Sequence, residues 1–297
     1  MQHRYGFVSN LIINDEKLYM KSIKLATIEK LGLEKVIEIY RNNLETVTQI
    51  LKYCNNNGIK YYRMGNLFPF NTHPILENFD YFKKFEQEIY ELGQLIRVYD
   101  IRISIHSSPY CVLASDNINV VKSSINEIEK HAKFFDLLEL PKNNRIVVHI
   151  GSGVGGKEKA IERFIQNYNK LSLNAKNRVA LENDDQKYSI KDVLNVSEKC
   201  TIPIILDTFH LSIYNPEKID IIDAVEKSTK TWKDGAAEIH YSEQDKDKII
   251  GSHSENINVT KLLNLVNSVN HLSFDIMLET KGTNKNAEMV IKELQNQ

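Results

Sequence analysis

The chain contains 297 residues, of which 42% are hydrophobic and 26% are charged, and its formal net charge is −1. Its apolar runs are all shorter than the roughly 20 residues that a membrane helix needs, so we expect no membrane span and no membrane partner. The three cysteines form no Cys-x-x-Cys pair, which supports neither a disulfide framework nor a thiolate zinc site. Because the N-terminus shows no signal-peptide pattern, we expect a cytoplasmic protein.

Short runs rich in Val, Ile and Leu alternate along the chain with stretches whose apolar residues recur at helical spacing. The runs predict strands at 5–9, 59–63, 101–105, 145–148, two within 178–210 that end at Glu182 and Asp207, and further strands at 236–241 and 272–278. The stretches predict helices at 41–57, 78–98, 117–138, 157–171, 190–199, 219–229, 259–268 and 284–295.

Strict alternation of strand and helix indicates an α/β protein with a parallel sheet. Eight such units without a break in composition fit a (β/α)8 barrel, or TIM barrel, as a single domain over residues 1–297. A doubly wound open sheet is the alternative, but it would gather its polar residues near one switch point. Polar residues follow nearly every predicted strand here, which favours the closed ring.

Acids and imidazoles gather where the predicted strands end. The strand ends carry Asn10, His106, His149, Glu182, Asp207 and Glu279, His240 lies one residue before its strand's end, and His73, His210 and His253 lie in the loops that follow. Any one of them alone is more often a solvated side chain. Together they would face one rim of a barrel, because the carboxyl ends of parallel strands meet there.

Imidazole and carboxylate without thiolate suit Mn, Zn, Fe or Co. Two or three divalent ions close together serve phosphoester hydrolysis, because one activates water and another stabilises the leaving oxygen. Glu238 and His240 are two residues apart on one strand, so both are expected to point into the barrel. For Glu238 we therefore expect a metal-linked role, with a salt bridge to Arg63 or Arg102 as the alternative.

A glycine-rich segment at 151–156 imitates a phosphate-binding loop. Lys157 follows it, but the next residue is Glu158 rather than the Ser or Thr that would hold Mg²⁺. We therefore expect no nucleotide cofactor. Lys157 is instead expected to contact a phosphate of the substrate and to take part in catalysis.

Several short motifs, in this order and spacing, resemble those of the UV damage endonucleases, DNA-repair enzymes with a TIM-barrel fold. They are Arg4-Tyr-Gly-Phe, Tyr62-Arg63, Leu67-Phe68-Pro69 with His73, His106 with Tyr110, His149-x-Gly151, Glu182-Asn-Asp-Asp185, Asp207-x-x-His210, His240-Tyr-Ser242, Gly251-Ser-His253 and Asp275-x-Met-x-Glu279-x-Lys281. The resemblance covers almost the whole chain.

The resemblance implies a metal set of His73, His106, His149, Glu182, Asp207, His210, His240, His253 and Glu279, to which we add Glu238. It implies Mn²⁺ as the usual ion, with Zn²⁺, Co²⁺ or Mg²⁺ as alternatives, and catalytic roles for Glu182, His240 and Glu279. It further implies cleavage of damaged double-stranded DNA immediately 5′ to the lesion, leaving a 3′-hydroxyl and a 5′-phosphate. We expect a monomer that contacts DNA or the lesion through Phe7, Asn10, Arg63, Pro109 and Tyr110.

This sequence departs from the family pattern at several of these positions. Pro109-Tyr110 stands where the family usually has a Gln-Tyr pair, Phe7 where it often has Tyr, and Leu211 where it often has a second His. Gly65-Asn66 replaces a common Ser-Ser. Glu238 replaces a lysine that can be modified to supply a carboxylate, so a native Glu can supply one directly.

Two other functions remain open from the sequence. Metal-dependent sugar isomerases and epimerases also place acids and histidines at the strand ends of a barrel, and an abasic-site endonuclease is a closer variant. A protein that binds damaged DNA without cutting it is the third possibility. The many carboxylates disfavour that last function, because a pure binder gains nothing from negative charge near phosphates.

Overall fold

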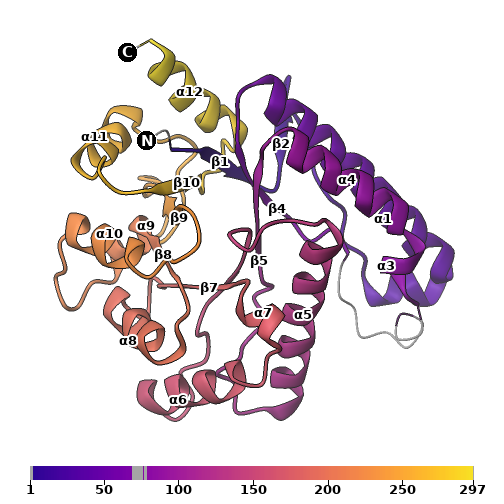
Figure 1. Ribbon diagram of the computed structural model, residues 1–297, viewed down its shortest axis with the longest axis horizontal. Coiled ribbons are helices and arrows are strands. Elements are labelled where there is room, and N and C mark those ends of the chain that lie inside the picture. Colours follow the sequence, from indigo (N-terminus) through magenta and orange to yellow (C-terminus); the bar gives the residue numbers. More distant parts are fainter. Residues whose placement is uncertain (1–2, 69–75, 77–78, 297) are drawn as a thin grey trace.

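The computed structural model describes residues 3–68, 76 and 79–296, and its centre is a closed ring of eight parallel strands (Figure 1). In ring order the strands are β1 (Tyr5–Val8), β4 (Tyr61–Met64), β5 (Arg102–His106), β6 (Arg145–Val148), β7 (Val179–Glu182), β8 (Ile204–Asp207), β9 (Ala237–Tyr241) and β10 (Phe274–Leu278). β1 pairs with both β4 and β10, which closes the ring. The predicted TIM barrel is confirmed.

Helices surround this ring (Figure 1). They are α1 (Leu25–Asn56), α3 (Tyr81–Lys84), α4 (Glu86–Val98), α5 (Ile118–Leu137), α6 (Lys157–Tyr168), α7 (Leu173–Lys176), α8 (Ile190–Cys200), α9 (Thr208–Ile213), α10 (Ile221–Thr229), α11 (Val259–Ser268) and α12 (Asn284–Gln295). Their apolar faces pack against the outer side of the strands in one hydrophobic core. Among the described residues, no helix is long and apolar enough to cross a membrane.

The N-terminal part differs from the sequence prediction in two ways. β2 (Leu11–Ile13) and β3 (Glu16–Leu18) form an antiparallel hairpin that was not predicted, and Asn14 and Asp15 at its tip both have positive φ, as a tight hairpin turn requires. α1 begins well before residue 41, because the chain stays helical on both sides of a kink at Gly32, whose φ is 69°.

The barrel interior is unusually polar on the side of β4, β5, β9 and β10. Arg102 donates to Asp275 at 2.8 Å inside the ring, and its guanidinium stacks over Tyr61 and Trp232. Because a buried charge is costly unless it is paired, the Arg102–Asp275 pair offsets part of this cost. Arg102 Nη2 and Glu238 Oε2 are buried there without a hydrogen-bond partner among the described residues.

Candidate metal centre

The acids and imidazoles predicted at strand ends do meet at one rim. His106, Glu182 and Asp207 are the last residues of β5, β7 and β8, while His149 and Glu279 directly follow β6 and β10. The strands are parallel and adjacent, so these positions lie at the same end of the barrel. Glu182, Asp207 and His240 are buried there.

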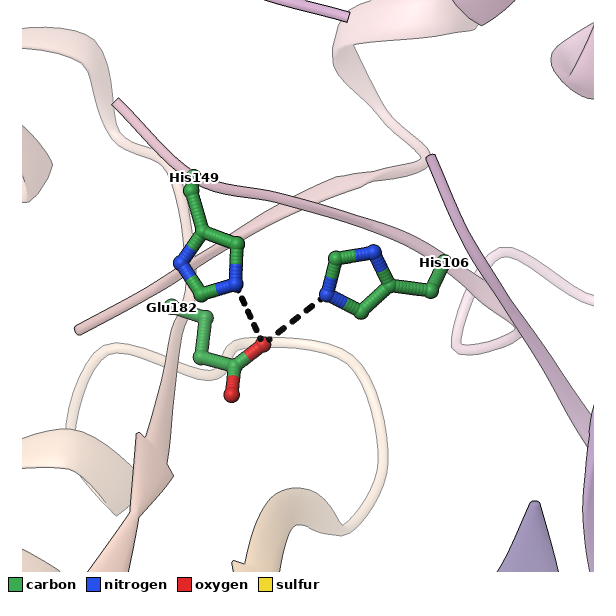
Figure 2. A group of neighbouring side chains, drawn as sticks. All are labelled: His106, His149 and Glu182. Carbon is green, nitrogen blue, oxygen red and sulfur yellow. Dashed lines mark ion pairs between the residues drawn. The ribbon is translucent and has the colours of Figure 1, made fainter. Parts of the chain in front are cut away.

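Glu182 is the central carboxylate of this rim. Its Oε2 lies 3.3 Å from His106 Nε2 and 3.4 Å from His149 Nε2 (Figure 2). Its Oε1 lies 2.9 Å from His240 Nδ1 and 3.5 Å from His210 Nδ1. One buried carboxylate therefore faces four imidazoles that come from four different strand ends.

A second group shares this carboxylate. Glu182, Asp207, His240 and Glu279 each offer one ligand atom, and these atoms all lie within 4.8 Å of one another. Asp207 also caps α9, because its Oδ1 accepts from the backbone N–H groups of Phe209 and His210 at 2.7 and 2.8 Å. Its side chain thus gains a fixed orientation at the end of β8.

Two carboxylate oxygens at this rim are buried and have no hydrogen-bond donor among the described residues. They are Glu182 Oε2 and Asp207 Oδ2. A buried oxygen without a partner is costly, and a divalent ion would satisfy it. A set of carboxylates and imidazoles without thiolate suits Mn²⁺, Zn²⁺ or Co²⁺, so the residues present fit such an ion.

Two of the predicted histidine ligands, His106 and His253, are oriented as metal ligands usually are. The Nδ1 atom of His106 lies 2.8 Å from the Ser107 carbonyl oxygen, and that of His253 lies 2.6 Å from the Glu279 carbonyl oxygen. If each Nδ1 carries the proton and donates it, the Nε2 lone pair is free to bind an ion. His253 lies outside the two groups described above, so its role as a ligand stays a prediction.

Asn183 was missed by the sequence reasoning, although it directly follows Glu182 at a strand end. Its carbonyl oxygen accepts from His210 Nδ1 at 2.9 Å, and its side-chain amide makes two hydrogen bonds with the backbone of Asp207, at 2.9 and 3.2 Å. Asn183 therefore fixes β7 against β8 and sets the orientation of the His210 ring.

Arg63, which the sequence predicted among the DNA or lesion contacts, lies behind the rim. It is only 3% exposed and lies inside the barrel. Its guanidinium donates to Glu279, lies against His240 Nε2 and is 3.5 Å from Glu238. A guanidinium in this position holds the carboxylates in place, and its contact with DNA or the lesion stays a prediction.

Glu238 lies one layer below the rim and is completely buried. It contacts Arg63 at 3.5 Å, Arg102 at 4.0 Å and His240 Nε2 at 3.0 Å. The alternative prediction, a salt bridge to Arg63 or Arg102, is therefore the one found. A direct bond from Glu238 to a metal stays a prediction.

The other predicted contacts differ in position. Phe7 is fully buried against the Tyr62 ring, so its contact with DNA stays a prediction that this burial does not support. Asn10 is half-buried just beyond β1, and Pro109 and Tyr110 are exposed in the loop after β5, with Tyr110 84% exposed. His73 lies outside the described residues.

Lys157 begins α6, and its Nζ lies 2.7 Å from Asp192 Oδ2 and 3.4 Å from the Tyr214 hydroxyl. Because this lysine already has a carboxylate partner, a phosphate would have to compete with Asp192 for it. Its predicted catalytic role stays a prediction.

The electrostatics of the rim favour the protonated forms of His210 and His240 when no cation is bound, whereas burial lowers the pKa of His149. Burial lowers the pKa of His240 and so does Arg63, but Glu182 and Glu279 outweigh them and raise it to about 10. Burial likewise opposes the charged form of His210, while Asp207 and Glu182 raise its pKa to about 9. Because a metal binds the neutral ring, these protons must leave when an ion binds.

The pKa values of two carboxylates at the rim, Asp207 and Glu279, are shifted in opposite directions. Burial raises the pKa of Asp207 to about 6, and the neighbouring charges of Glu279 and Glu182 add to it against the effect of His210. Burial also raises the pKa of Glu279, but the positive charges of Arg63 and His240 outweigh burial and lower this pKa to about 2. Glu279 is therefore charged at any ordinary pH, which suits a ligand for a cation.

We expect the free energy of unfolding of the metal-free protein to fall as the pH rises from about 6.5 through 9. The pKa of His210 is raised from 6.5 to about 9 in the folded state, so its contribution is complete below 6.5 and is lost as the pH passes 9. The expected loss is roughly 2 kcal/mol. Urea unfolding in EDTA across this window measures it.

The matched control is His210→Asn, which removes this titration and should reduce the slope of the profile. The raised pKa of His240, about 10, leaves a smaller slope of the same sign. A wild-type stability that stays constant or rises across the window would contradict the expected charge state of the rim.

An eight-stranded barrel that gathers buried acids and imidazoles at the carboxyl ends of its strands defines a TIM-barrel protein of the kind that carries an active site at that rim. Residues 3–297 match the family UV-endonuclease UvdE. The chain belongs to this family, a family of endonucleases that act in DNA repair, and the resemblance noted from the motifs is confirmed.

Similarity to individual proteins supports the same family assignment. The UV DNA damage endonuclease of Bacillus thuringiensis subsp. konkukian is 30% identical over 301 aligned positions, which cover 98% of this chain and 94% of that protein. The UV DNA damage endonuclease of Clostridium perfringens is 34% identical over 265 positions, 88% of this chain but only 64% of that longer protein. The crystal structure of SacUVDE superposes with a TM-score of 0.89 at 34% identity, covering 99% of both chains.

More distant barrels share the fold alone. An L-ribulose 3-epimerase has a TM-score of 0.56 at 15% identity, with 80% of this chain and 76% of that one covered. A family 2 AP endonuclease from Brucella melitensis has a TM-score of 0.55 at 11% identity, covering 94% and 93%. At such identities the common barrel gives no support for sugar isomerisation or for abasic-site cleavage.

Proposed function

We propose that the protein hydrolyses the phosphodiester immediately 5′ to a UV or other lesion in double-stranded DNA, leaving a 3′-hydroxyl and a 5′-phosphate. The observation that carries this proposal is Glu182, one buried carboxylate shared by two groups of ligands at the rim of the barrel. Membership of the UV-endonuclease family supports DNA as the substrate.

Two ion positions on either side of Glu182 would use the residues present. His106, His149 and Glu182 would hold one ion, and Glu182, Asp207, His240 and Glu279 would hold the other. When bound, divalent ions here, with Mn²⁺ the expected one, would favour ionisation of a water and stabilise the leaving oxygen. A third ion, with His73, His210, His253 or Glu238 among its ligands, is a further expectation.

The protein's own residues keep this site in order. Arg63 lies behind Glu279 and prevents its carboxylate from turning away from the rim. Asn183 holds the His210 ring and the backbone of Asp207. Preorganised ligands are worth more than mobile ones, because no energy is spent on arranging them during the reaction.

Tyr110 is the residue that supports contact with bases. It is exposed on the loop that follows His106, a residue of the candidate metal centre. Aromatic side chains stack on bases without regard to sequence, which suits an enzyme that reads distortion. Pro109 precedes it, so discrimination here would depend on shape and stacking rather than on an amide. A monomer working inside the cell, where the DNA is, completes the proposal.

The test uses a duplex with one cyclobutane pyrimidine dimer, labelled at either end of the damaged strand. We expect a nick directly 5′ to the dimer in Mn²⁺, with a 3′-end that a polymerase can extend, and no nick in EDTA. Failure to cut any lesion-bearing duplex with Mn²⁺, Co²⁺, Zn²⁺ or Mg²⁺ would sink the proposal. Tight binding without cutting would instead make the protein a damage-binding protein.

A further inference from the structure

Two adjacent isoleucines stand out from the surface in the loop between β9 and α11. Ile249 is 84% exposed and Ile250 is 80% exposed. Apolar side chains this large gain nothing from contact with water. Single exposed apolar residues are ordinary on a protein surface, but a neighbouring pair at one loop tip is a candidate contact with a partner.

The loop beneath the pair is tightly braced. The side-chain amide of Gln244 donates to the carbonyl oxygen of Ile249 at 3.0 Å, and its oxygen accepts from the Gly251 N–H at 2.9 Å. The Asp245 N–H donates to Ser252 O at 2.8 Å, and the Ser252 N–H donates to Ile249 O at 3.1 Å. These hydrogen bonds hold the isoleucine pair in a fixed position, which a contact with a partner needs.

The base of the same loop lies beside Glu279 of the candidate metal centre. Gly251, Ser252 and His253 line a cavity of about 350 Å³ together with Glu279 and Lys281. Lys281 Nζ lies 2.7 Å from Asp245 Oδ2, which ties the loop to the segment after β10. A substrate that reaches Glu279 through this cavity therefore passes beside the isoleucine pair.

The pair and Tyr110 are on opposite sides of the rim. In the closed order of eight strands, three strands separate β5 from β9 in either direction. Tyr110 is on the loop after β5, and the isoleucines are on the loop after β9. Glu182 contacts His106 from the first of these strands and His240 from the other, so the candidate metal centre lies between the two exposed apolar groups.

We propose that Ile249 and Ile250 form an apolar wedge that enters the duplex between stacked bases, across the cleavage site from Tyr110. This rests on the proposed function, since it assigns duplex DNA as the partner. Exposed Lys246 and Lys248 on the same loop favour a phosphate backbone nearby; the exposed Asp247 between them opposes it, while Asp245 is paired with Lys281. An apolar wedge opens a base step at the cost of its stacking, and damaged duplexes lower that cost.

The test compares wild type with the double variant Ile249→Ala, Ile250→Ala in single-turnover reactions. The substrate carries one pyrimidine dimer and a 2-aminopurine in the undamaged strand beside it, whose fluorescence rises on unstacking. We expect the variant to lose the rise and to cut the duplex roughly tenfold to a hundredfold more slowly. On a substrate with an unpaired bubble around the lesion the loss should be clearly smaller, because the bases are already unstacked.

The controls are Val98→Ala, an equally exposed apolar change at the far end of the barrel, and Ile249→Leu with Ile250→Leu, which keeps apolar bulk. Both should unstack and cut as wild type does. An alanine variant that matches wild type on the duplex would overturn the wedge, as would equal losses on duplex and bubble. Loss of self-association in ultracentrifugation with incision unchanged would assign the pair to a protein contact instead.

The proposed incision activity and the proposed isoleucine wedge can be refuted independently of each other. If wild type cuts no damaged duplex, the proposed function fails, and the fluorescence rise on binding still tests the wedge. If wild type cuts and the alanine variant unstacks and cuts equally, the wedge alone is wrong.

Discussion

Replacing Glu182 with Gln is expected to slow incision of a dimer-containing duplex by about a thousandfold or more, equivalent to about 4 kcal/mol of transition-state stabilisation. Glutamine has the same shape as glutamate but cannot supply a charged oxygen to either group of ligands. Glu182 belongs to both groups, so the loss should affect both ion positions at once. Single-turnover kinetics with Mn²⁺ measure the change in rate.

Metal binding gives an independent measurement for the same variant. Calorimetric titration with Mn²⁺ should show weaker binding and fewer ions per chain than in wild type. Glu129→Gln is the matched control, because Glu129 contacts Ser172 on the helical side of the molecule and should change neither quantity. If the Glu182→Gln variant binds the wild-type number of ions and cuts at the wild-type rate, Glu182 is not a ligand that the reaction needs.

Replacing Arg63 with Met is expected to lower the free energy of unfolding of the metal-free protein by about 3–5 kcal/mol. The variant keeps the length of the side chain but leaves Glu238 and Glu279 without the cation that they share. Buried carboxylates that lose their partner are costly, and this cost greatly exceeds the small worth of a surface pair. Urea unfolding in EDTA measures the difference.

The control for Arg63 is Arg4→Met. Arg4 pairs with Asp100 at 3.1 Å on the surface, so its loss should cost less than about 1 kcal/mol. In a Glu238→Gln background the Arg63 substitution should cost less, because one of the two uncompensated charges is gone. Mn²⁺ should restore part of the stability by supplying positive charge near Glu279. An unchanged urea midpoint for Arg63→Met would show that the carboxylates do not need the guanidinium.

The positions of the ligands were predictable because strand ends in a parallel barrel converge whatever their distance along the chain. Glu182 and Asp207 each end a run of β-branched and apolar residues, and that pattern requires no knowledge of which strands are neighbours. Because strands and helices alternate along the chain, the strands are parallel and both strand ends lie at the same rim. Asn183 carried the same signal, because it directly follows Glu182 at the end of β7.

The burial of Arg63 and Phe7 could not be predicted from the sequence, because it depends on long-range packing. Arg63 on β4 meets His240 on β9 and Glu279 after β10, and nothing local in the sequence gives these distances across the ring. Phe7 is paired with Tyr62 in the register of β1 with β4, and both side chains point to the helix-covered side of the barrel. That register decides which side of the sheet each side chain faces. Side-chain direction near the end of a strand depends on that register, so strand assignment alone could not decide which residues reach DNA.

The β2–β3 hairpin escaped prediction for a different reason. Its strands are three residues each, too short for a periodic pattern to be seen, and only the Asn14-Asp15 turn signals it. Likewise α9 is a short helix that begins directly after β8, with Asp207 as its cap. The capping position explains why an acid at this strand end is also held in one orientation.

The most direct test of the shared carboxylate is anomalous diffraction at the manganese edge from crystals grown with Mn²⁺. We predict two ions on either side of Glu182, one beside His106 and His149 and the other beside Asp207, His240 and Glu279. Ions bound elsewhere on the protein, or crystals of active enzyme with no anomalous peak within ligand distance of Glu182, would contradict the account.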